Sequence, residues 1–477
     1  MRKFIIGVSL AMAGLALGVR GQPAPPANAP DHKFYDFAPT PPMGWNSWDA
    51  FGSSVKEADV VANVDYIDKN LKSHGWTLVT IDIQWYQPTA QKDQYIAGAK
   101  LEMDANGRLL PAANRFPMVQ DSKSFKAMGD YLHSKGLSFG LHIMRGVPRQ
   151  AVDSNPPTAI LGTQLTCADI ANKPDSCRWN TDMYGVDMTK PGAQEYYDSV
   201  YKQFASWGLD FAKVDDLAGK RPEIEAIRKA IDKCGRPIVL SISMGSGANQ
   251  GPHLVDNANT WRISFDFWDN WPALYNQFAN LNNFTPYRGP GHWPDADMLP
   301  LGNLKTWQKD LFTKFTHDEQ TTLMTLWSIG KSPLILGANL PRNDAFTLSL
   351  LTNDELIAVD QHSTNNKQVS NKNGQIVWMA DVPDSKDKYV ALFNVGAPPA
   401  GGRGRGGPAP APTPATTAAT APATGPVIIT VPLSDLGLSG SIKVRDLWMH
   451  KDLGVSKDAI EALVNAHGAV LYRIKPQ

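Results

Sequence analysis

Residues 211–216 read FAKVDD, and this stretch decides the fold. A short, mostly apolar run that ends in charge predicts a buried parallel strand whose carboxyl end opens into a site. Isoleucines at helical spacing follow, at Ile224, Ile227 and Ile231. The unit is therefore strand, loop and helix. Lys213, just inside the strand end, would hold Asp215 ionised, as a carboxylate nucleophile requires.

The same alternation of apolar runs and amphipathic stretches recurs about eight times between residues 42 and 358. Strand candidates are 43–48, 77–83, 137–143, 211–215, 237–243 and 260–265, with weaker ones near 292–298 and 334–338. Amphipathic stretches such as 57–74, 121–135 and 192–207 lie between them. The pattern predicts an α/β fold, a (β/α)8 TIM barrel with long loops, whose chemistry lies at the carboxyl ends of the strands.

The alternation of strands and helices stops in residues 359–477, which we assign to a second domain. Short strands without helices are expected at 368–369, 376–379, 389–393, 427–431, 441–446 and 468–474. This pattern predicts a C-terminal antiparallel β-sandwich. Residues 397–426 are rich in Pro, Ala, Thr and Gly, and we expect a disordered insertion between two strands because such a tract cannot bury a core.

The N-terminus predicts export. Residues 1–21 place Arg2 and Lys3 before an apolar run and end in small residues, as a signal peptide does. The Pro- and Ala-rich residues 22–41 should be an extended lead-in. A periplasmic or extracellular location would let Cys167 and Cys177, which share one loop, form a disulfide, and we expect the third cysteine to be a buried small side chain.

Composition argues against several partner classes. Lys plus Arg and Asp plus Glu each total 46, so the formal net charge is zero, and neither nucleic acid nor insertion into a membrane is favoured. The histidines are scattered without metal-ligand spacing, so no metal is expected. The sequence leaves the oligomeric state open.

Polar side chains stand at the ends of the predicted strands. They are Asp82, His142, Asp215 with Asp216, Ser243 and Asp266. Any one of these residues could be explained as a helix N-cap. Polar residues at the ends of five predicted strands favour one shared site instead.

Two of these carboxylates suit the hydrolysis of a glycosidic bond with retention. In that reaction one carboxylate attacks the anomeric carbon, and the other protonates the leaving oxygen and then activates water, so no cofactor is required. We assign the nucleophile to Asp215, with Asp216 as its rival. We assign the acid/base to Asp266, with Asp269 as its rival, because the apolar residues around Asp266 would help it to keep a proton.

A resemblance adds to this assignment. The motif MGWNSW at 43–48 is followed by Ile-Asp-x-x-Trp at 81–85, Lys-x-Asp at 213–215, Arg-x-x-x-Asp at 262–266 and Gly-Pro-Gly-x-Trp-x-Asp-x-Asp-Met-Leu at 289–299. Together with Val-Arg-Asp-Leu-Trp at 444–448, they resemble the α-galactosidase family, glycoside hydrolase family 27. The resemblance implies a retaining barrel hydrolase with a C-terminal β-sandwich. Asp215 matches the family nucleophile, Asp266 matches its acid/base, and Trp45, Asp82, Lys213 and Arg262 match sugar-binding positions.

Three positions depart from the family pattern. The family's galactosidases usually have two adjacent Asp residues here, which bind the hydroxyl groups at carbons 4 and 6, and this chain has Ile83 as the second of the pair. His142 replaces a Tyr, and Ser243 replaces a Glu that lies near the 2-hydroxyl. We count all three as substrate-binding candidates, with Gln84 and His142 as possible replacements for the lost acceptor. Losing a charged acceptor weakens the recognition of galactose.

The leading interpretation is therefore a secreted retaining α-galactosidase. On the same scaffold, a β-L-arabinopyranosidase would suit Ile83, and an α-N-acetylgalactosaminidase would suit Ser243. An isomalto-dextranase-type hydrolase is a third alternative. A non-catalytic carbohydrate-binding protein is the alternative from another class, and the presence of both carboxylates argues against it. In the third loop, Arg145 and Arg149 are interpreted as ion-pair partners that fix the loop.

Overall fold

The computed structural model describes residues 32–92, 94–243, 245, 247–308, 311–399 and 425–477. Its central sheet has eight parallel strands in the order β10-β9-β8-β7-β3-β2-β1-β11. They are β1 (Met43–Asn46), β2 (Leu78–Ile81), β3 (Ser138–Met144), β7 (Phe211–Asp215), β8 (Val239–Ser243), β9 (Thr260–Arg262), β10 (Trp293–Asp295) and β11 (Leu334–Leu336). All eight predicted barrel strands are confirmed.

A contact between the two edge strands closes the sheet. Leu299, just after β10, bridges in parallel to Leu336 of β11, and its N–H donates to the carbonyl of Ile335 at 2.7 Å. The first strand pair requires a glycine, because a Cβ at Gly44 would lie 2.1 Å from the carbonyl oxygen of Leu78. The result is the predicted (β/α)8 barrel.

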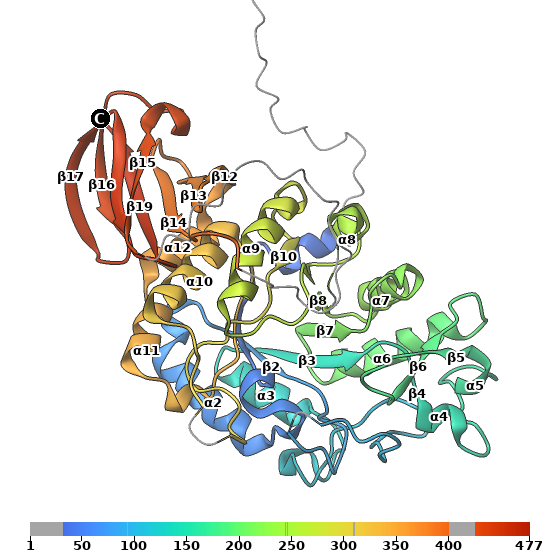
Figure 1. The fold of residues 1–477 in the computed structure, drawn as a ribbon. Helices are drawn as coiled ribbons and strands as arrows, with labels where there is room; N and C mark the ends of the chain where they lie inside the picture. The colour runs from blue at the N-terminus through green and yellow to red at the C-terminus, as the bar shows by residue number, and fades with distance from the viewer. Residues whose placement is uncertain (1–31, 93, 244, 246, 309–310, 400–424) are drawn as a thin grey trace, which may run out of the picture. The chain divides into compact units, whose positions relative to one another are not determined.

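Helices surround the barrel strands (Figure 1). The longer ones are α2 (Glu57–Asn70), α3 (Lys126–Ser134), α6 (Ala193–Ser206), α7 (Arg221–Lys233), α9 (Trp271–Phe284), α10 (His317–Gly330), α11 (Ala345–Leu351) and α12 (Asp354–His362). Short turns are α1 (Trp48–Phe51), α8 (Gly251–Val255) and the 3-10 helices η2 (Gly52–Ser54), η3 (Lys72–His74), η4 (Pro117–Val119), η5 (Ala248–Gln250), η6 (Thr285–Tyr287) and η7 (Leu340–Arg342).

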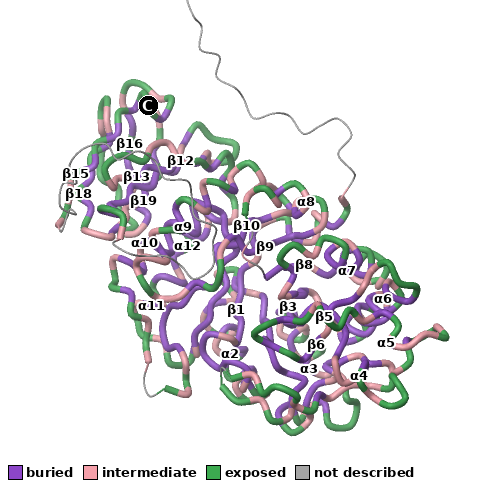
Figure 2. The backbone as a smooth tube through the Cα atoms, turned by 45° about the vertical axis from the view of Figure 1, so that its right-hand side comes forward, coloured by how far each residue is buried: buried purple, intermediate pink, exposed green. Residues whose placement is uncertain are grey.

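Sequence patterns explain where these helices begin and which face they bury. The isoleucines of α7, at 224, 227 and 231, are all buried, as their spacing predicted. Thr316 and Glu319 cap the start of α10 reciprocally, through bonds of 3.2 and 2.9 Å to each other's backbone N–H. Figure 2 shows the buried barrel strands against the more exposed outer helices.

The long loop after β3 forms a small layer of its own. It contains α4 (Arg149–Asp153), α5 (Cys167–Ile170) and the antiparallel strands β4 (Val147–Pro148), β5 (Ala171–Ser176) and β6 (Met183–Val186), in the order β4-β6-β5.

The disulfide predicted in this loop is wrong, because both cysteines are free thiols in the structure. Each is buried and packs into the apolar core. Burial raises the pKa of Cys167 to about 12 and that of Cys177 to about 11. Disulfide formation needs a thiolate, so these sites disfavour it. Cys234 is half-buried rather than fully buried.

The predicted C-terminal sandwich is present. One sheet has the order β12 (Thr364–Lys372), β13 (Gln375–Asp381), β14 (Lys388–Asn394), β19 (Ala469–Pro476), β16 (Ser441–Asp446) and β17 (Lys451–Lys457). The other pairs β15 (Val427–Pro432), which precedes η8 (Leu433–Leu436), with β18 (Ala459–Val464). Val390, Leu392, Ile429 and Ile460 share the core between the sheets. Sequence analysis missed β17 and β18. Most of the expected disordered insertion, residues 400–424, lies outside the described residues.

The outer face of the six-stranded sheet packs against the barrel helices. Phe393 of β14 makes an edge contact with Phe278 of α9, with ring centroids 4.9 Å apart. Thr322 of α10 donates to the carbonyl of His467 at 2.6 Å, and the indole N–H of Trp448 donates to Thr325 at 2.9 Å. The barrel and sandwich thus share one apolar core.

Only the end of the expected lead-in is described. It contains the 3-10 helix η1 (Lys33–Phe37) rather than a fully extended chain, and the carbonyl of Ala38 accepts a 2.8 Å bond from the indole of Trp293 in β10. The predicted signal peptide lies outside the described residues. Within the described chain, none of the helices combines the length and apolar character that crossing a bilayer demands.

Candidate active site

The strand register brings the predicted site residues to one end of the barrel. Asp215, the last residue of β7, pairs with Met144 of β3 on one side and Ser243 of β8 on the other. Two residues earlier, Lys213 pairs with His142. Because the carboxyl ends of parallel strands meet at one face, these side chains lie together, as the sequence predicted.

Asp82, directly after β2, is a buried carboxylate that accepts hydrogen bonds at both oxygens. It accepts 2.8 Å and 2.7 Å bonds from Lys213 Nζ and Asn46 Nδ2 at one oxygen, and a 2.8 Å bond from the N–H of Ile83 at the other. Burial acts to raise its pKa, but Lys213 and the other donors outweigh it, and the pKa of Asp82 is lowered to about 2. The same Asp82 charge helps to raise the pKa of Lys213 against its own burial.

Asp215 is more accessible than Asp82, with 24% of its side chain exposed against 2%. One oxygen lies 3.3 Å from His142 Nε2, and the other accepts a 2.8 Å bond from the N–H of Asp216. Burial would raise its pKa, yet the pKa is lowered, because the bond to His142 and the charges of Lys213 and Arg262 favour the ionised form. This is the state that a carboxylate nucleophile needs.

Arg262 connects the second carboxylate to the same site. Its Nη2 lies 2.9 Å from Asp266 and 3.3 Å from Asp297, and Nη1 donates to Ser243 Oγ at 3.4 Å. Asp266 is 77% exposed. The apolar setting predicted for it is therefore absent, because Phe265 points largely into solvent and Asp266 pairs with Arg262 instead.

The two rival carboxylates are each bound by another group. Asp216 adopts a left-handed φ of 61° and pairs with Arg145 at 3.0 Å, so its carboxylate is occupied. Asp269 accepts the backbone N–H of Lys314 at 2.8 Å. Arg145 is buried and also binds Asp175 and Glu223, at 2.7 and 2.9 Å, which fits its interpretation as a loop-fixing residue.

Trp45 and Ile83 are buried, as are the other predicted sugar-binding residues Asp82, His142 and Ser243. Trp45 is fully buried, and its indole N–H donates to the carbonyl of Ala338 at 2.7 Å. Ile83 is 2% exposed and belongs to the apolar core. Next to it, the side-chain amide of Gln84 donates to Asp182 at 2.5 Å, while its side-chain oxygen Oε1 has no partner in the described structure.

Sequence reasoning missed three residues of this region. Asn46 binds Asp82, and its place at the end of β1 was the available signal. Asp49 is buried in the turn that follows, where burial and then the charge of Asp297 raise its pKa. Tyr95 lies in a loop without regular structure, and no sequence pattern marks it. Burial, followed by the charges of three site carboxylates, raises its pKa.

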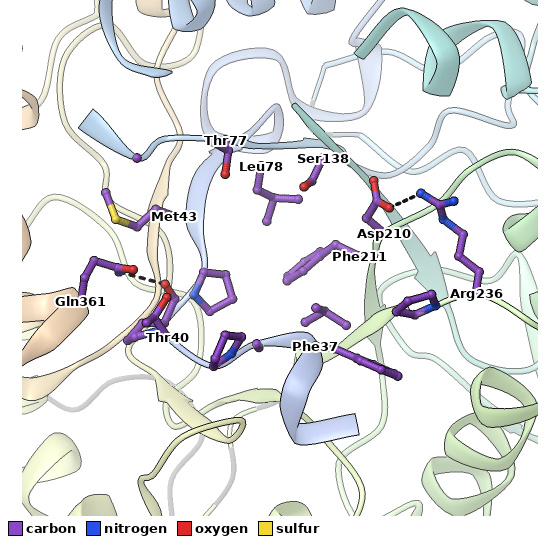
Figure 3. Close-up of a pocket in the computed structure, with 17 residues that line it drawn as sticks. Phe37, Thr40, Met43, Thr77, Leu78, Ser138, Asp210, Phe211, Arg236 and Gln361 are labelled. Carbon is purple, nitrogen blue, oxygen red and sulfur yellow. Dashed lines mark hydrogen bonds and ion pairs between the residues drawn. The ribbon is translucent and has the colours of Figure 1, made fainter. Parts of the chain in front are cut away.

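A cavity of about 500 Å³ opens at the opposite end of the barrel. Figure 3 shows it among the first residues of the strands, including Met43, Leu78, Ser138 and Phe211. Its charged groups, Asp210 and Arg236, form an ion pair with each other. Neither of these two side chains is therefore available to bind a ligand in the cavity. The catalytic candidates lie at the other strand ends, and this cavity is separate from them. Among the described residues, no group of three or more His, Cys, Asp or Glu is arranged to hold a metal ion.

Comparison with known proteins fits this geometry. Residues 179–362 match the family model described as alpha galactosidase A, and residues 372–474 match the alpha galactosidase C-terminal beta sandwich domain. A solved β-L-arabinopyranosidase of glycoside hydrolase family 27 from Geobacillus stearothermophilus is 44% identical, covers 93% of this chain and 98% of its own, and superposes with a TM-score of 0.85. This chain belongs to glycoside hydrolase family 27.

Other family 27 relatives carry different substrate names. A putative α-N-acetylgalactosaminidase structure from Bacillus halodurans is 38% identical, covering 92% of this chain and 97% of its own, with a TM-score of 0.78. Alpha-galactosidase 2 of Arabidopsis thaliana is 27% identical over 445 residues, which are 91% of this chain and 89% of the relative. The protein is accordingly a glycosidase of the α-galactosidase type that hydrolyses O-glycosyl bonds, and its substrate is a carbohydrate.

Proposed function

We propose that this family 27 enzyme is an exported, retaining β-L-arabinopyranosidase. The observation that carries the choice of sugar is Ile83, a buried apolar side chain where galactosidases of the family usually place a second carboxylate. β-L-Arabinopyranose has the ring geometry of α-galactose without the exocyclic hydroxymethyl group. Because this sugar has no 6-hydroxyl, a site with Ile83 in place of the second carboxylate loses less binding with it than with galactose.

In the proposed mechanism Asp215 attacks the anomeric carbon while Asp266 protonates the leaving oxygen. The intermediate is a glycosyl ester of Asp215, and Asp266 then removes a proton from the water that hydrolyses it, so the anomeric configuration is retained. The support is electrostatic: the pKa of Asp215 is lowered despite its burial, chiefly by the bond to His142, while Asp266 is open to the leaving-group side.

Asp82 and Lys213 would bind sugar hydroxyls rather than react. Both are held in one fixed arrangement by the 2.8 Å ion pair, so they offer a preorganised acceptor and donor beside Asp215. His142 and Ser243 would complete the site at the positions where the family differs. Neither can replace the charge of a second carboxylate next to Asp82.

The second candidate is α-galactosidase. Asp82, the first residue of the usual acidic pair, is retained, and the curated relatives named above include α-galactosidases. A hydroxymethyl group placed beside Ile83 would lose a hydrogen bond, which weakens binding by about 1–3 kcal/mol. We therefore expect α-galactosides to be cleaved more slowly than β-L-arabinopyranosides, rather than not at all.

A panel of aryl glycosides tests the proposal. It holds the β-L-arabinopyranoside, α-galactoside, α-N-acetylgalactosaminide and α-glucoside, each offered to the wild type and to Asp215→Asn. We expect the arabinopyranoside to give the highest kcat/KM and the activity to collapse in the variant. A higher value for any other member would overturn the assigned sugar, and an unchanged variant would overturn the role of Asp215.

Export is the remaining part of the proposal and rests on residues 1–21 alone. Expression of the full-length chain in a bacterial host, followed by cell fractionation and N-terminal sequencing of the product, tests it. We expect a processed protein outside the cytoplasm. An unprocessed cytoplasmic protein would refute this part and would leave the enzymatic proposal intact.

A further inference from the structure

Three aromatic rings extend outward from the candidate active site. Trp48, two residues after β1, stacks on Tyr95 with ring planes 4° apart and centroids separated by 6.1 Å. Trp179, from the loop between β5 and β6, packs on Tyr95 with a centroid distance of 5.2 Å and a 52° tilt. These three rings, which we name the aromatic ladder, come from three separate parts of the sequence.

The inner end of the ladder is tied to the sugar-binding carboxylate. The backbone N–H of Trp48 donates to Asn46 Oδ1 at 2.8 Å, and Asn46 Nδ2 donates to Asp82 at 2.7 Å. Two hydrogen bonds therefore connect the backbone of Trp48 to Asp82. The middle ring, Tyr95, is close enough to the site carboxylates for their charges to raise its pKa, although burial is the larger cause.

The outer end of the ladder is open. Trp179 is 44% exposed although its ring contacts Tyr95. Trp combines a large apolar face with a polar N–H and is enriched where proteins meet ligands or partners. Two residues before Trp179, burial raises the pKa of Cys177, and the charges of Asp216 and Asp215 add to this effect.

We propose that Trp179 forms a subsite that binds the first sugar ring of the leaving group. This inference rests on the proposed function and extends it, because it assigns an oligosaccharide rather than a simple glycoside as the substrate class. The terminal sugar must lie inward, where Asp82 and Asp215 are, so a ring at the outer end of the ladder belongs to the other side of the scissile bond.

The chemistry of the ladder favours a sugar as its occupant. The C–H face of a pyranose is apolar and its edge is polar, which matches a flat aromatic face with water around it. Tyr95, which stacks on Trp48, packs against Trp179, so we expect little rotamer freedom to be lost when a sugar ring stacks on Trp179. Asp266, whose side chain is open to solvent, faces the same leaving-group side under the proposed mechanism.

Two substrates with one sugar in common test the subsite. β-L-Arabinopyranosyl fluoride has a leaving group without a ring, whereas a β-L-arabinopyranosyl-galactose disaccharide has one to stack. We expect Trp179→Ala to lower kcat/KM for the disaccharide by about tenfold and to leave the fluoride unchanged. Trp179→Phe keeps a ring and should retain most of the disaccharide activity. Leu463→Ala, at an exposed apolar residue on the small domain, controls for surface truncation.

Binding without turnover gives a second readout. In the Asp215→Asn protein, calorimetry should show that Trp179→Ala weakens the disaccharide and leaves free arabinose unchanged. In the kinetic test, an equal loss of kcat/KM on the fluoride and the disaccharide, or no loss on either, would overturn the subsite. In the binding test, equal disaccharide affinity with and without the Trp179 ring, or no disaccharide binding at all, would also overturn it. Failure of the proposed function is distinguishable, because the wild type would then not hydrolyse the fluoride.

Discussion

Replacing Lys213 with methionine removes the charge that neutralises Asp82 and keeps the volume of the side chain. The ion pair is 2.8 Å long, and its two side chains are 14% and 2% exposed. Removing one partner of a buried pair leaves an uncompensated charge and lowers the free energy of unfolding by about 3–5 kcal/mol. Lys126→Met is the matched control, because Lys126 pairs with Asp130 at 2.7 Å on the surface, where about 0.5 kcal/mol is expected.

Urea denaturation of the single variants and of Lys213→Met with Asp82→Asn measures this coupling. Each single variant leaves one charge buried, whereas the double variant leaves none, so the double variant should lose much less than the sum of the two. Additive losses, or a Lys213→Met loss no larger than that of Lys126→Met, would refute the account of the site's electrostatics.

The pH dependence of this stability has a defined sign. The pKa of Asp82 falls from 3.8 to about 2 on folding, because Lys213 outweighs the effect of burial. Such a depressed carboxyl group contributes stability that is fully present above about pH 4 and is lost as the pH falls through about 2, with a total of about 2 kcal/mol. Asp82→Asn should remove this part of the acid destabilisation.

Further predictions concern specificity, loop fixation and thiols. Ile83→Asp should raise kcat/KM for the aryl α-galactoside relative to the arabinopyranoside by about tenfold, since it restores an acceptor, and an unchanged ratio on the aryl panel would contradict the proposed role of Ile83. Arg145→Met should lower the urea midpoint and kcat together, because it leaves buried carboxylates unpaired. Arg149→Met, which loses a 2.9 Å bond to a carbonyl, should have little effect, and equal effects would argue against this reasoning. Thiol titration in denaturant without reductant should find all three cysteines free, whereas a cross-link between Cys167 and Cys177 would leave one.

Most of the fold was predictable because its signals are local. Each barrel strand is a short apolar run between helices, and all eight were found, including the three-residue β10 and β11. In the sandwich, β17 was missed because almost every residue in Lys451–Lys457 is exposed, so no apolar alternation marks it. β18 alternates Ile460, Ala462 and Val464 inward, but its partner β15 follows the Pro-rich insertion, so its pairing was not evident from the sequence.

The site was predictable where strand register fixes it and not where distant segments meet. Asp82, Lys213 and Asp215 lie at strand ends, so the topology alone brings them together. The burial of Trp45 depends on the carbonyl of Ala338, which is 293 residues away in sequence. The exposure of Asp266 likewise depends on how its loop turns, and its apolar neighbours in sequence gave the wrong environment.

The most direct test of the account is to trap the covalent intermediate. The enzyme is incubated with an activated fluoro-sugar of β-L-arabinopyranose, which slows hydrolysis of the glycosyl ester more than its formation, and is then digested and mapped by mass spectrometry. The account predicts one added sugar, on the peptide that contains Asp215, and loss of the label in Asp215→Asn. A label on Asp216, or turnover with inversion of the anomeric configuration and no label, would contradict it.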